Sequence, residues 1–544
     1  MFGNSSSGRR RRSKSSSRSS SSRSSVITPK PRKPIDWLTW TGISLFIIIF
    51  AGGLHPTAYI VDATVRSYAW GLCGLFAIWG MFLWLKGKWN LSESRPALWI
   101  IAFIAALAVI GGLQLIPVSS SFVTLISPIH REIQQSLTAV GFLVPERIPF
   151  ATAPEKAAAG WDQLIAMGCF FIGVSALSTR RAGAIAMISS VILFSFLEGI
   201  IGVLRFTFTA TGRSSGIVFN PNHHAAAVIM GLPLAIAAIS HIRASNWGRM
   251  RTQVASRGDQ MLMLTVIACI AGVGWLLSMS RGSLISGACV LTAWWVVEAI
   301  MNYREYSRKQ SITFTAWFRG LPLLPILIPC ICLVLLLFSA AYLPQIVTRF
   351  TNPDQHLFGR MELWLASLKG LAQTHFLGMG FGGTEYALNR YIRFNTTRYA
   401  PIQAHNDFVQ IVAELGIIAG IIGCIAIGGC AKALYRQELE VAKKRNWTKR
   451  FARRAILVGV LITLIHSLFD FHLRVPVVCF EFLTLLALLL SNSGAEPLMD
   501  SARHKLRGQR EDDKIPILPP AALPKGEHLA NPAGFGLIES DGID

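Results

Sequence analysis

A histidine at the edge of a long apolar run is the strongest candidate for chemistry in this chain. His405 is followed by Asn406 and Asp407, and an apolar run begins at Phe408. An imidazole ordinarily titrates near pH 6.5, so it can accept a proton from a hydroxyl at neutral pH. A single interfacial histidine is more often structural than catalytic, so its surroundings must decide its role. With the arginines described next, we predict that His405 is a general base.

Three arginines stand at comparable edges of apolar runs. Arg213 precedes an Asn-Pro-Asn-His-His segment at residues 220–224, Arg281 lies in a Ser-Arg-Gly turn between two runs, and Arg360 opens a helix-like stretch. A guanidinium offers a fixed fork of donors to phosphate oxygens and stays charged at any relevant pH. Each arginine alone could be snorkelling to a membrane interface. Together with His405 they predict a shared pyrophosphate site, with head groups around a cavity about 10 Å across.

Other motifs give weaker signals. The sequence has no Walker loop, H-E-x-x-H, C-x-x-C or D-x-D. A G-x-S-x-G match at residues 212–216, centred on Ser214, lacks the preceding strand of a nucleophile elbow, and we assign it to chance. His223 and His224 would point about 100° apart on a helix, and no third ligand lies at a suitable spacing. We therefore expect no metal and no cofactor.

The composition of the chain indicates the kind of fold that positions these residues. Hydrophobic residues make up 52% of the 544-residue chain and charged residues 15%, whereas a soluble domain has about 25% charged residues. The apolar residues also lie in long runs. The nine cysteines fall in or at the ends of these runs and have the character of small buried hydrophobic residues. We predict an all-α fold, a polytopic bundle of transmembrane helices.

The apolar runs approach the length of roughly 20 residues that crosses a bilayer as a helix. They predict about twelve spans, at Trp37–Leu54, Tyr68–Leu85, Leu98–Ile116, Trp161–Leu177, Gly183–Phe206, Ala225–Ser240, Met261–Met279, Ser283–Met301, Leu321–Leu343, Phe408–Gly429, Ala455–Phe471 and Val475–Leu490. Ionisable residues inside such spans are costly and tend to face the bundle interior or a wet cavity. They are Glu198, Glu298, Glu414, His466, Asp470 and Glu481.

The basic residues predict the orientation. If the N-terminus is cytoplasmic, alternate loops carry the Lys and Arg clusters, the densest at residues 432–454. Residues 1–34 and 492–544 are then disordered cytoplasmic tails around a transmembrane domain at 35–491. Orientation accounts for most of the net charge of +23, so we expect no nucleic-acid partner. Reporters fused at Arg257 and Arg393 should lie on opposite sides.

The longest of the segments expected outside the cytoplasm is residues 344–407, an extracytoplasmic loop with short helices. It contains Arg360, a Gly-rich stretch at 378–383 and three further arginines, Arg390, Arg393 and Arg398. Loops near 60 residues can cross regardless of their charge. The alternative, which we favour, is an outward-facing anion site.

The sequence resembles the O-antigen ligase and polymerase superfamily of bacterial membrane glycosyltransferases. The resemblance is clearest over residues 265–428 and rests on Ser280-Arg281-Gly282, on Gly359-Arg360 with Trp364 and the Gly378-x-Gly380-x-Gly382 stretch, and on His405-Asn406 with Gly416. Outside this range, Arg213 to Asn222 resembles an upstream segment of the family, and residues 466–471 resemble a segment near its end.

The resemblance implies a metal-independent, inverting glycosyltransferase in the bacterial inner membrane, acting on the extracytoplasmic face. Its donor would be a glycan on undecaprenyl pyrophosphate, and its acceptor a hydroxyl of lipid A core, a growing polysaccharide or a protein. In this hypothesis His405 is the base, Asn406 and Asn222 belong to the substrate site with Asn406 orienting the acceptor, and Arg213, Arg281 and Arg360 neutralise the departing pyrophosphate.

Two other classes stay open. A glycan-lipid flippase or other secondary transporter would also have about twelve spans, but its key residues should lie near the bilayer midplane on broken helices. A non-catalytic subunit of envelope polysaccharide assembly would have no use for His405. Ligation and polymerisation are not distinguished by the sequence.

Overall fold

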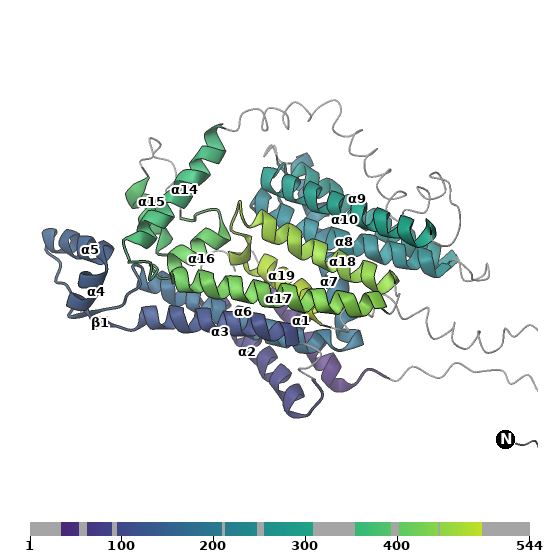
Figure 1. Cartoon of the computed structure of the whole chain (residues 1–544), viewed down its shortest axis with the longest axis horizontal. Helices are drawn as coiled ribbons and strands as arrows, with labels where there is room; N and C mark the ends of the chain where they lie inside the picture. Colours follow the sequence, from purple (N-terminus) through teal and green to yellow (C-terminus); the bar gives the residue numbers. More distant parts are fainter. Residues whose placement is uncertain are drawn as a thin grey trace, which may run out of the picture.

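The chain folds into a bundle of long helices. The computed structural model describes residues 34–53, 63–89, 95–208, 213–246, 255–307, 354–392, 402–443 and 447–491. The long helices lie side by side in Figure 1, and they are α1 (Trp37–Gly53), α2 (Ala63–Leu85), α3 (Arg95–Leu115), α6 (Pro154–Ser178), α7 (Arg181–Phe208), α8 (Pro221–Asn246), α9 (Ala255–Leu277), α10 (Arg281–Ser307), α17 (Ile417–Lys443), α18 (Trp447–His466) and α19 (Pro476–Leu490).

The bundle is that of a multi-pass membrane protein. Within the described ranges, α3, α6, α7, α8, α9, α10 and α17 are long and apolar enough to cross a membrane, and α1, α2 and α19 contain shorter apolar segments. These helices confirm the predicted polytopic all-α fold. The span expected at Leu321–Leu343, and the tails at residues 1–33 and 492–544, lie outside the described residues.

Packing inside the bundle rests on aromatic side chains and small residues. Phe170 of α6 and Phe480 of α19 lie with ring centroids 4.5 Å apart, and Phe46 of α1 also stacks on Phe170, with centroids 6.2 Å apart. Gly173 lets Phe76 approach, because a Cβ at this glycine would lie 2.4 Å from the Phe76 ring. Such close packing takes the place of hydrophobic driving force between helices in a bilayer.

Shorter elements gather at one end of the bundle (Figure 1). Between α3 and α6 lie β1 (Val118–Ser119), α4 (Ser120–Ile126), α5 (Pro128–Ala139) and β2 (Arg147–Ile148), and the two strands form an antiparallel pair. At the same end lie α14 (Asp354–Ala372), α15 (Thr384–Tyr391) and α16 (Asp407–Leu415), which we call the cap. A 3-10 helix, η3 (His472–Arg474), joins α18 to α19.

The prediction of one uninterrupted span at Phe408–Gly429 is wrong. The helix α16 ends at Leu415, Gly416 has φ 88°, and the long helix α17 begins only at Ile417. A Cβ on Gly416 would lie 2.7 Å from the carbonyl oxygens of Phe376 and Leu377, so the two backbones touch here. Glu414, expected inside the membrane, therefore belongs to the cap.

A second expected span ends earlier than predicted. The apolar run at Ala455–Phe471 continues to Phe471, but α18 ends at His466. Residues 467–471 turn away from the helix axis and lead into η3. Asp470 therefore lies beyond the helix, at the end of the bundle that carries the cap.

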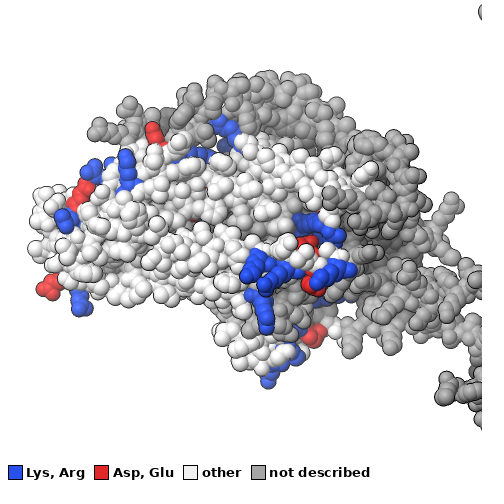
Figure 2. Space-filling model, in the orientation of Figure 1, with Lys and Arg blue, Asp and Glu red and all other residues white. Residues whose placement is uncertain are grey.

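Charged residues mark the two ends of the bundle. On the face shown in Figure 2, a broad band without Lys, Arg, Asp or Glu separates charges near α4, α5, α14 and α15 from a basic cluster at the opposite ends of the long helices. A hydrocarbon layer requires such a band, because charged side chains are costly at membrane depth.

Candidate functional site

The carboxylate of Asp470 is the centre of the candidate site. It is buried, with 1% of its side chain exposed. His405 Nδ1 lies 3.0 Å from Oδ1, and Asn222 Nδ2 donates to Oδ2 at 2.6 Å. Arg360 adds an ion pair at 3.7 Å to Oδ2. The carboxylate thus joins the segment before α16, the start of α8 and the first half of the cap helix α14.

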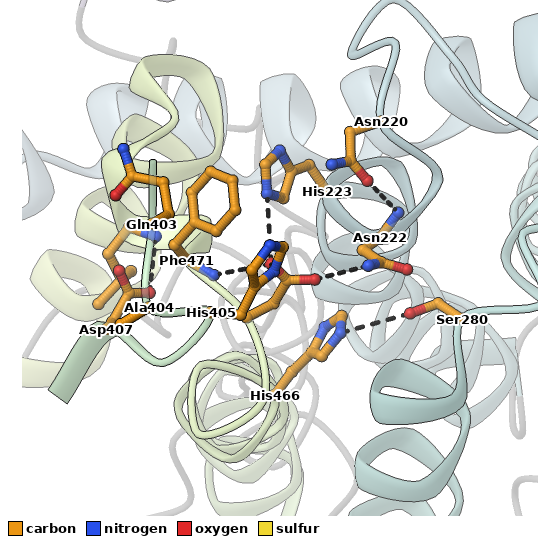
Figure 3. Close-up of polar contacts among 12 residues, drawn as sticks. Asn220, Asn222, His223, Ser280, Gln403, Ala404, His405, Asp407, His466 and Phe471 are labelled. Carbon is orange, nitrogen blue, oxygen red and sulfur yellow. Dashed lines mark hydrogen bonds and ion pairs between the residues drawn. The ribbon is translucent and has the colours of Figure 1, made fainter. Parts of the chain in front are cut away.

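Figure 3 shows how these side chains converge. His405 points toward a common centre from one segment and Asn222 and His223 from another, and His466 points toward Ser280. The Nε2 atom of His223 lies 3.8 Å from Asp470 Oδ1, and that of His466 lies 3.5 Å from the Ser280 hydroxyl. Two segments far apart in the sequence, 220–224 and 466–471, therefore share one site.

The backbone around His405 fixes where its ring lies. Asn406 caps α16, since its side-chain oxygen accepts hydrogen bonds from the amides of Phe408 and Val409 at 3.0 and 3.1 Å. His405 directly precedes Asn406 and has φ 51°, a left-handed conformation that costs a non-glycine residue energy. The ring packs edge-on against Phe471, with centroids 5.0 Å apart. These contacts hold the imidazole at the carboxylate.

Asp407 connects the start of α16 to residues 467–473 through hydrogen bonds to their backbone. Its amide donates to the carbonyl oxygens of Ser467 and Asp470, and its carboxyl accepts from the amide of Leu473 at 3.1 Å. Only 1% of this residue is exposed. These contacts give Asp407 a structural role, in which it fixes the start of α16 against residues 467–473.

The arginines differ in whether they reach the carboxylate directly or through another side chain. Arg213 donates to the Ser278 carbonyl at 2.9 Å and to the Asn222 side-chain oxygen at 2.8 Å, so it reaches Asp470 through Asn222. Arg360 contacts Asp470 itself. Arg281, the first residue of α10, lies close enough to Arg360 for their charges to interact.

Electrostatics explain how a charged group persists in this buried position. Burial by itself would raise the pKa of Asp470, but the imidazoles of His223 and His405 more than offset it and hold that pKa well below its usual value. Burial lowers the pKa of Arg360, the charge of Arg281 lowers it further, and Asp470 opposes both effects. Cations therefore surround one ionised carboxylate, leaving an excess of positive charge suited to an anionic ligand.

The arrangement can perform general base catalysis. If the ionised Asp470 accepts the proton of His405 Nδ1, the lone pair of His405 Nε2 is left to accept a proton from a substrate. The His405 side chain is 32% exposed, whereas its partner carboxylate is buried. The imidazole is therefore accessible to a substrate, while the carboxylate that orients it is buried.

The structure thus brings His405, Asn222, Arg213, Arg281 and Arg360 to one place. Asn406 is occupied as a helix cap, and its part in orienting an acceptor stays a prediction. Sequence reasoning missed Asp470 as the partner of His405, although it flagged the residue as a costly ionisable group in an apolar run. The two residues are 65 positions apart in the sequence, so no local spacing predicts their contact.

The Gly-rich stretch at residues 378–383 holds α16 in place through backbone hydrogen bonds. Gly378 has φ 88°, and the amides of Met379 and Gly380 donate to the carbonyl oxygens of Ala413 and Glu414 at 3.0 and 2.8 Å. The side chain of Gln114, at the end of α3, donates to the carbonyl oxygens of Leu377 and Glu414. The stretch therefore fixes α16, and with it the cap, against the bundle.

Comparison with known proteins adds a family match. Residues 265–424 match the family model described as O-antigen ligase. A search of curated proteins found no significant match. The matched range holds Arg281, Arg360 and His405, whereas Arg213 precedes it and Asp470 follows it. The cluster around Asp470 therefore extends beyond the matched range on both sides.

Proposed function

Because this membrane protein carries an O-antigen ligase domain at residues 265–424, we propose that it transfers or polymerises a glycan from an undecaprenyl-pyrophosphate donor onto an acceptor hydroxyl at the extracytoplasmic face. The domain is that of a membrane glycosyltransferase of the O-antigen ligase type. The donor, the acceptor and the face are our proposal. The acceptor would be lipid A core, a growing polysaccharide or a protein.

The reaction proposed is a single displacement at the anomeric carbon. The acceptor hydroxyl gives its proton to His405 Nε2, and its oxygen forms the new bond to the anomeric carbon. The bond from that carbon to the pyrophosphate oxygen breaks, and its electron pair leaves with the pyrophosphate. Attack from the face opposite the leaving group inverts the anomeric configuration. No step draws on a metal, because the leaving group is already activated.

The arginines have the complementary task in this proposal. Negative charge develops on the pyrophosphate as the bond breaks, and donors that are already in place stabilise it without reorganisation. Arg281 and Arg360 would contact the phosphates directly, while Arg213 is held by Ser278 and Asn222 at the edge of the same site. Asp470 would keep His405 oriented and stabilise the imidazolium formed during transfer.

One observation carries the proposal: a partly exposed imidazole is anchored by a buried carboxylate that also collects arginine contacts. A transporter gains nothing from a base held at one end of the bundle. A non-catalytic subunit would have no use for a partly exposed imidazole anchored on a buried carboxylate.

Transfer of sugar from a purified undecaprenyl-pyrophosphate-linked glycan tests the function. His405→Ala should lower the rate by about 10² to 10⁴, the usual range for a lost general base. His405→Gln keeps a hydrogen-bonding group of similar reach but cannot accept the proton, so it should be nearly as inactive. Near-normal transfer by the Gln variant at equal protein abundance would contradict the base role.

His375 provides a matched control. It is also a cap histidine with positive φ, at 48°, and its Nδ1 lies 2.7 Å from the carbonyl oxygen of Ile126. It lies outside the cluster around Asp470, so His375→Gln should retain most of the transfer activity. An equal loss in both Gln variants would mean that the cap tolerates no histidine replacement, and the His405 result would not indicate catalysis.

A further inference from the structure

A second set of hydrogen-bonded polar side chains lies inside the bundle, next to the segment that carries Arg213. Glu198 of α7 accepts from the amide of Val218 at 3.2 Å through Oε1, and its Oε2 lies 2.8 Å from His224 Nδ1. On the far side of the ring, His224 Nε2 lies 3.1 Å from the Ser214 hydroxyl. Glu198, His224 and Ser214 are all fully buried. The carboxylate thus assigns the Nδ1 proton to His224 and leaves Nε2 to accept from Ser214.

The order Ser-His-Glu is that of a hydrolase triad, and Ser214 is the central residue of the G-x-S-x-G match. The surroundings exclude that role. A Cβ on Gly202 would lie 2.4 Å from the Ser214 hydroxyl, and a Cβ on Gly216 would lie 1.7 Å from Glu198 Oε2. Atoms of the chain therefore occupy the space around the hydroxyl and the carboxylate, and no acyl group can approach the serine.

The same contacts fix the segment that carries Arg213. Residues 213–218 lie between α7 and α8 in the chain and have no regular secondary structure. Ser214 is held by its amide, which donates to the Leu277 carbonyl at 2.9 Å, and by its hydroxyl on His224. At the other end of the segment, Val218 donates to Glu198, and Arg205 donates to the Gly216 carbonyl at 2.7 Å.

This anchoring leaves Arg213 little freedom. Its backbone is adjacent to the doubly anchored Ser214, and its guanidinium bridges the Ser278 carbonyl and Asn222. Because Asn222 also donates to Asp470, a displacement of Arg213 would release the amide that bonds the central carboxylate.

We propose that Glu198, His224 and Ser214 form a buried positioning device that sets Arg213 for the pyrophosphate group of the donor. The inference rests on the proposed function, since it takes Arg213 to be a donor-binding residue. The three residues touch no substrate. They act through the 213–218 segment, so their effect falls on the donor and not on the acceptor.

Donor kinetics and amide hydrogen exchange test the device separately. Ser214→Ala removes one hydroxyl and keeps the packing, and Glu198→Gln removes the charge that orients His224. Both should lower kcat/KM for the lipid-linked donor about three- to tenfold, the range for a lost buried hydrogen bond, with the acceptor KM unchanged. Exchange at residues 213–218 should become faster in both variants. In an Arg213→Ala background, Ser214→Ala should cause no further loss.

Ser195→Ala is the matched control. Ser195 is a buried serine of α7 whose hydroxyl donates to the Ala227 carbonyl at 3.1 Å and to Glu481 at 3.4 Å, and neither of these bonds reaches the 213–218 segment. It should change neither the exchange of that segment nor the donor kinetics. If Glu198→Gln does not accumulate, Ser214→Ala still decides the matter.

The outcomes separate the inference from the proposed function. Unchanged exchange at 213–218 in Ser214→Ala overturns the positioning device, whatever the kinetics show. An equal kinetic loss with and without Arg213 overturns it as well. Faster exchange, combined with normal donor kinetics in Arg213→Ala, supports the device as an anchor and overturns the donor role of Arg213 in the proposed function.

Discussion

His405, Asn406 and Asp407 follow one another in sequence but have different surroundings. The His405 side chain is 32% exposed, whereas Asn406 and Asp407 are buried in contacts with α16 and with the 467–473 segment. The two buried residues therefore supply the rigidity that the exposed one requires. A base must be held within hydrogen-bond reach of its substrate, and a displacement of about 1 Å can cost about 10² in rate.

The surroundings of Asp407 predict a dependence of stability on pH. Burial raises the pKa of Asp407 to about 7. Between about pH 4 and pH 7 the folded protein keeps a proton that the unfolded chain releases, so the free energy of unfolding falls as pH rises through this window. Asp407→Asn removes this dependence and can still accept from Leu473. Melting temperatures in detergent should favour the variant increasingly from pH 5 to about pH 8.

Asp36 supplies the control of opposite sign. The Thr39 hydrogen bonds lower its pKa against the effect of burial, so its contribution to stability is constant above the ordinary carboxyl range and is lost only in acid. Asp36→Asn should shift the melting temperature by the same amount at every pH from 5 to about 8. A flat difference between Asp407→Asn and wild type would show that Asp407 is ionised throughout.

The sequence was most informative about residue types and least informative about their partners. His405 and the three arginines were predicted because imidazole and guanidinium have distinctive chemistry at membrane edges. Their contacts could not be predicted, since the Asn222–Asp470 bond joins residues 248 positions apart. The Ser214–His224–Glu198 chain was missed for a related reason: a motif defined by a preceding strand gives no indication of a role between two helices.

At the scale of elements, the helix α16 and the turn after it decide where the site lies. Hydropathy predicted the long helices well, because a bilayer demands about 20 apolar residues from each. It failed at Phe408–Gly429, where the apolar run continues through a backbone break. The positive φ of Gly416 and its contact with residues 376 and 377 are determined by tertiary packing, and the buried Glu414 was the local hint that this part is not a membrane span.

A side chain added at Gly416, where the backbone breaks between α16 and α17, should disturb the candidate site. Gly416→Ala places a Cβ at φ 88° and 2.7 Å from two carbonyl oxygens, so α16 or the Gly-rich stretch must shift. A backbone with φ 88° and ψ 171° is almost confined to glycine and costs a non-glycine residue about 1 to 3 kcal/mol. We expect a lower melting temperature and a loss of transfer of about 10², because His405 directly precedes α16.

Gly428→Ala is the comparison within the next helix. Nothing lies within 4 Å of a Cβ at Gly428, which is in the middle of α17. Alanine is favoured over glycine in a helix interior by roughly 1 kcal/mol, so this variant should be at least as stable as wild type and fully active. Equal behaviour of the two variants would show that the break at Gly416 does not position the cap.

For the whole molecule, the site lies where several helix ends meet. The starts of α8, α10 and α19 and the ends of α9 and α18 all lie around the cluster, in keeping with alternating directions through a bilayer. The basic turn between α2 and α3 and the turn between α6 and α7 lie at the opposite ends of their helices. The positive-inside orientation, which stays a prediction, would place the cap on the extracytoplasmic side.

Reporter insertions can determine the orientation. One should follow Leu143, which is 97% exposed between α5 and β2, and another should follow Gly87, in the turn after α2. The first should be active only as an extracytoplasmic reporter and the second only as a cytoplasmic one. The same side for both insertions would refute the alternating topology, and exchanged sides would put the candidate site on the cytoplasmic face.

The bond between Asn222 and Asp470 also has a consequence for biogenesis. Ribosomes add about 5 to 20 residues per second, so the 248 residues between these partners separate their synthesis by tens of seconds. During that interval the arginine of the 213–218 segment is already in the membrane, but the carboxylate and the anchored imidazole are not. In the proposed function, a nascent chain would therefore lack the anchored base needed to consume lipid-linked donor until its last helices are inserted.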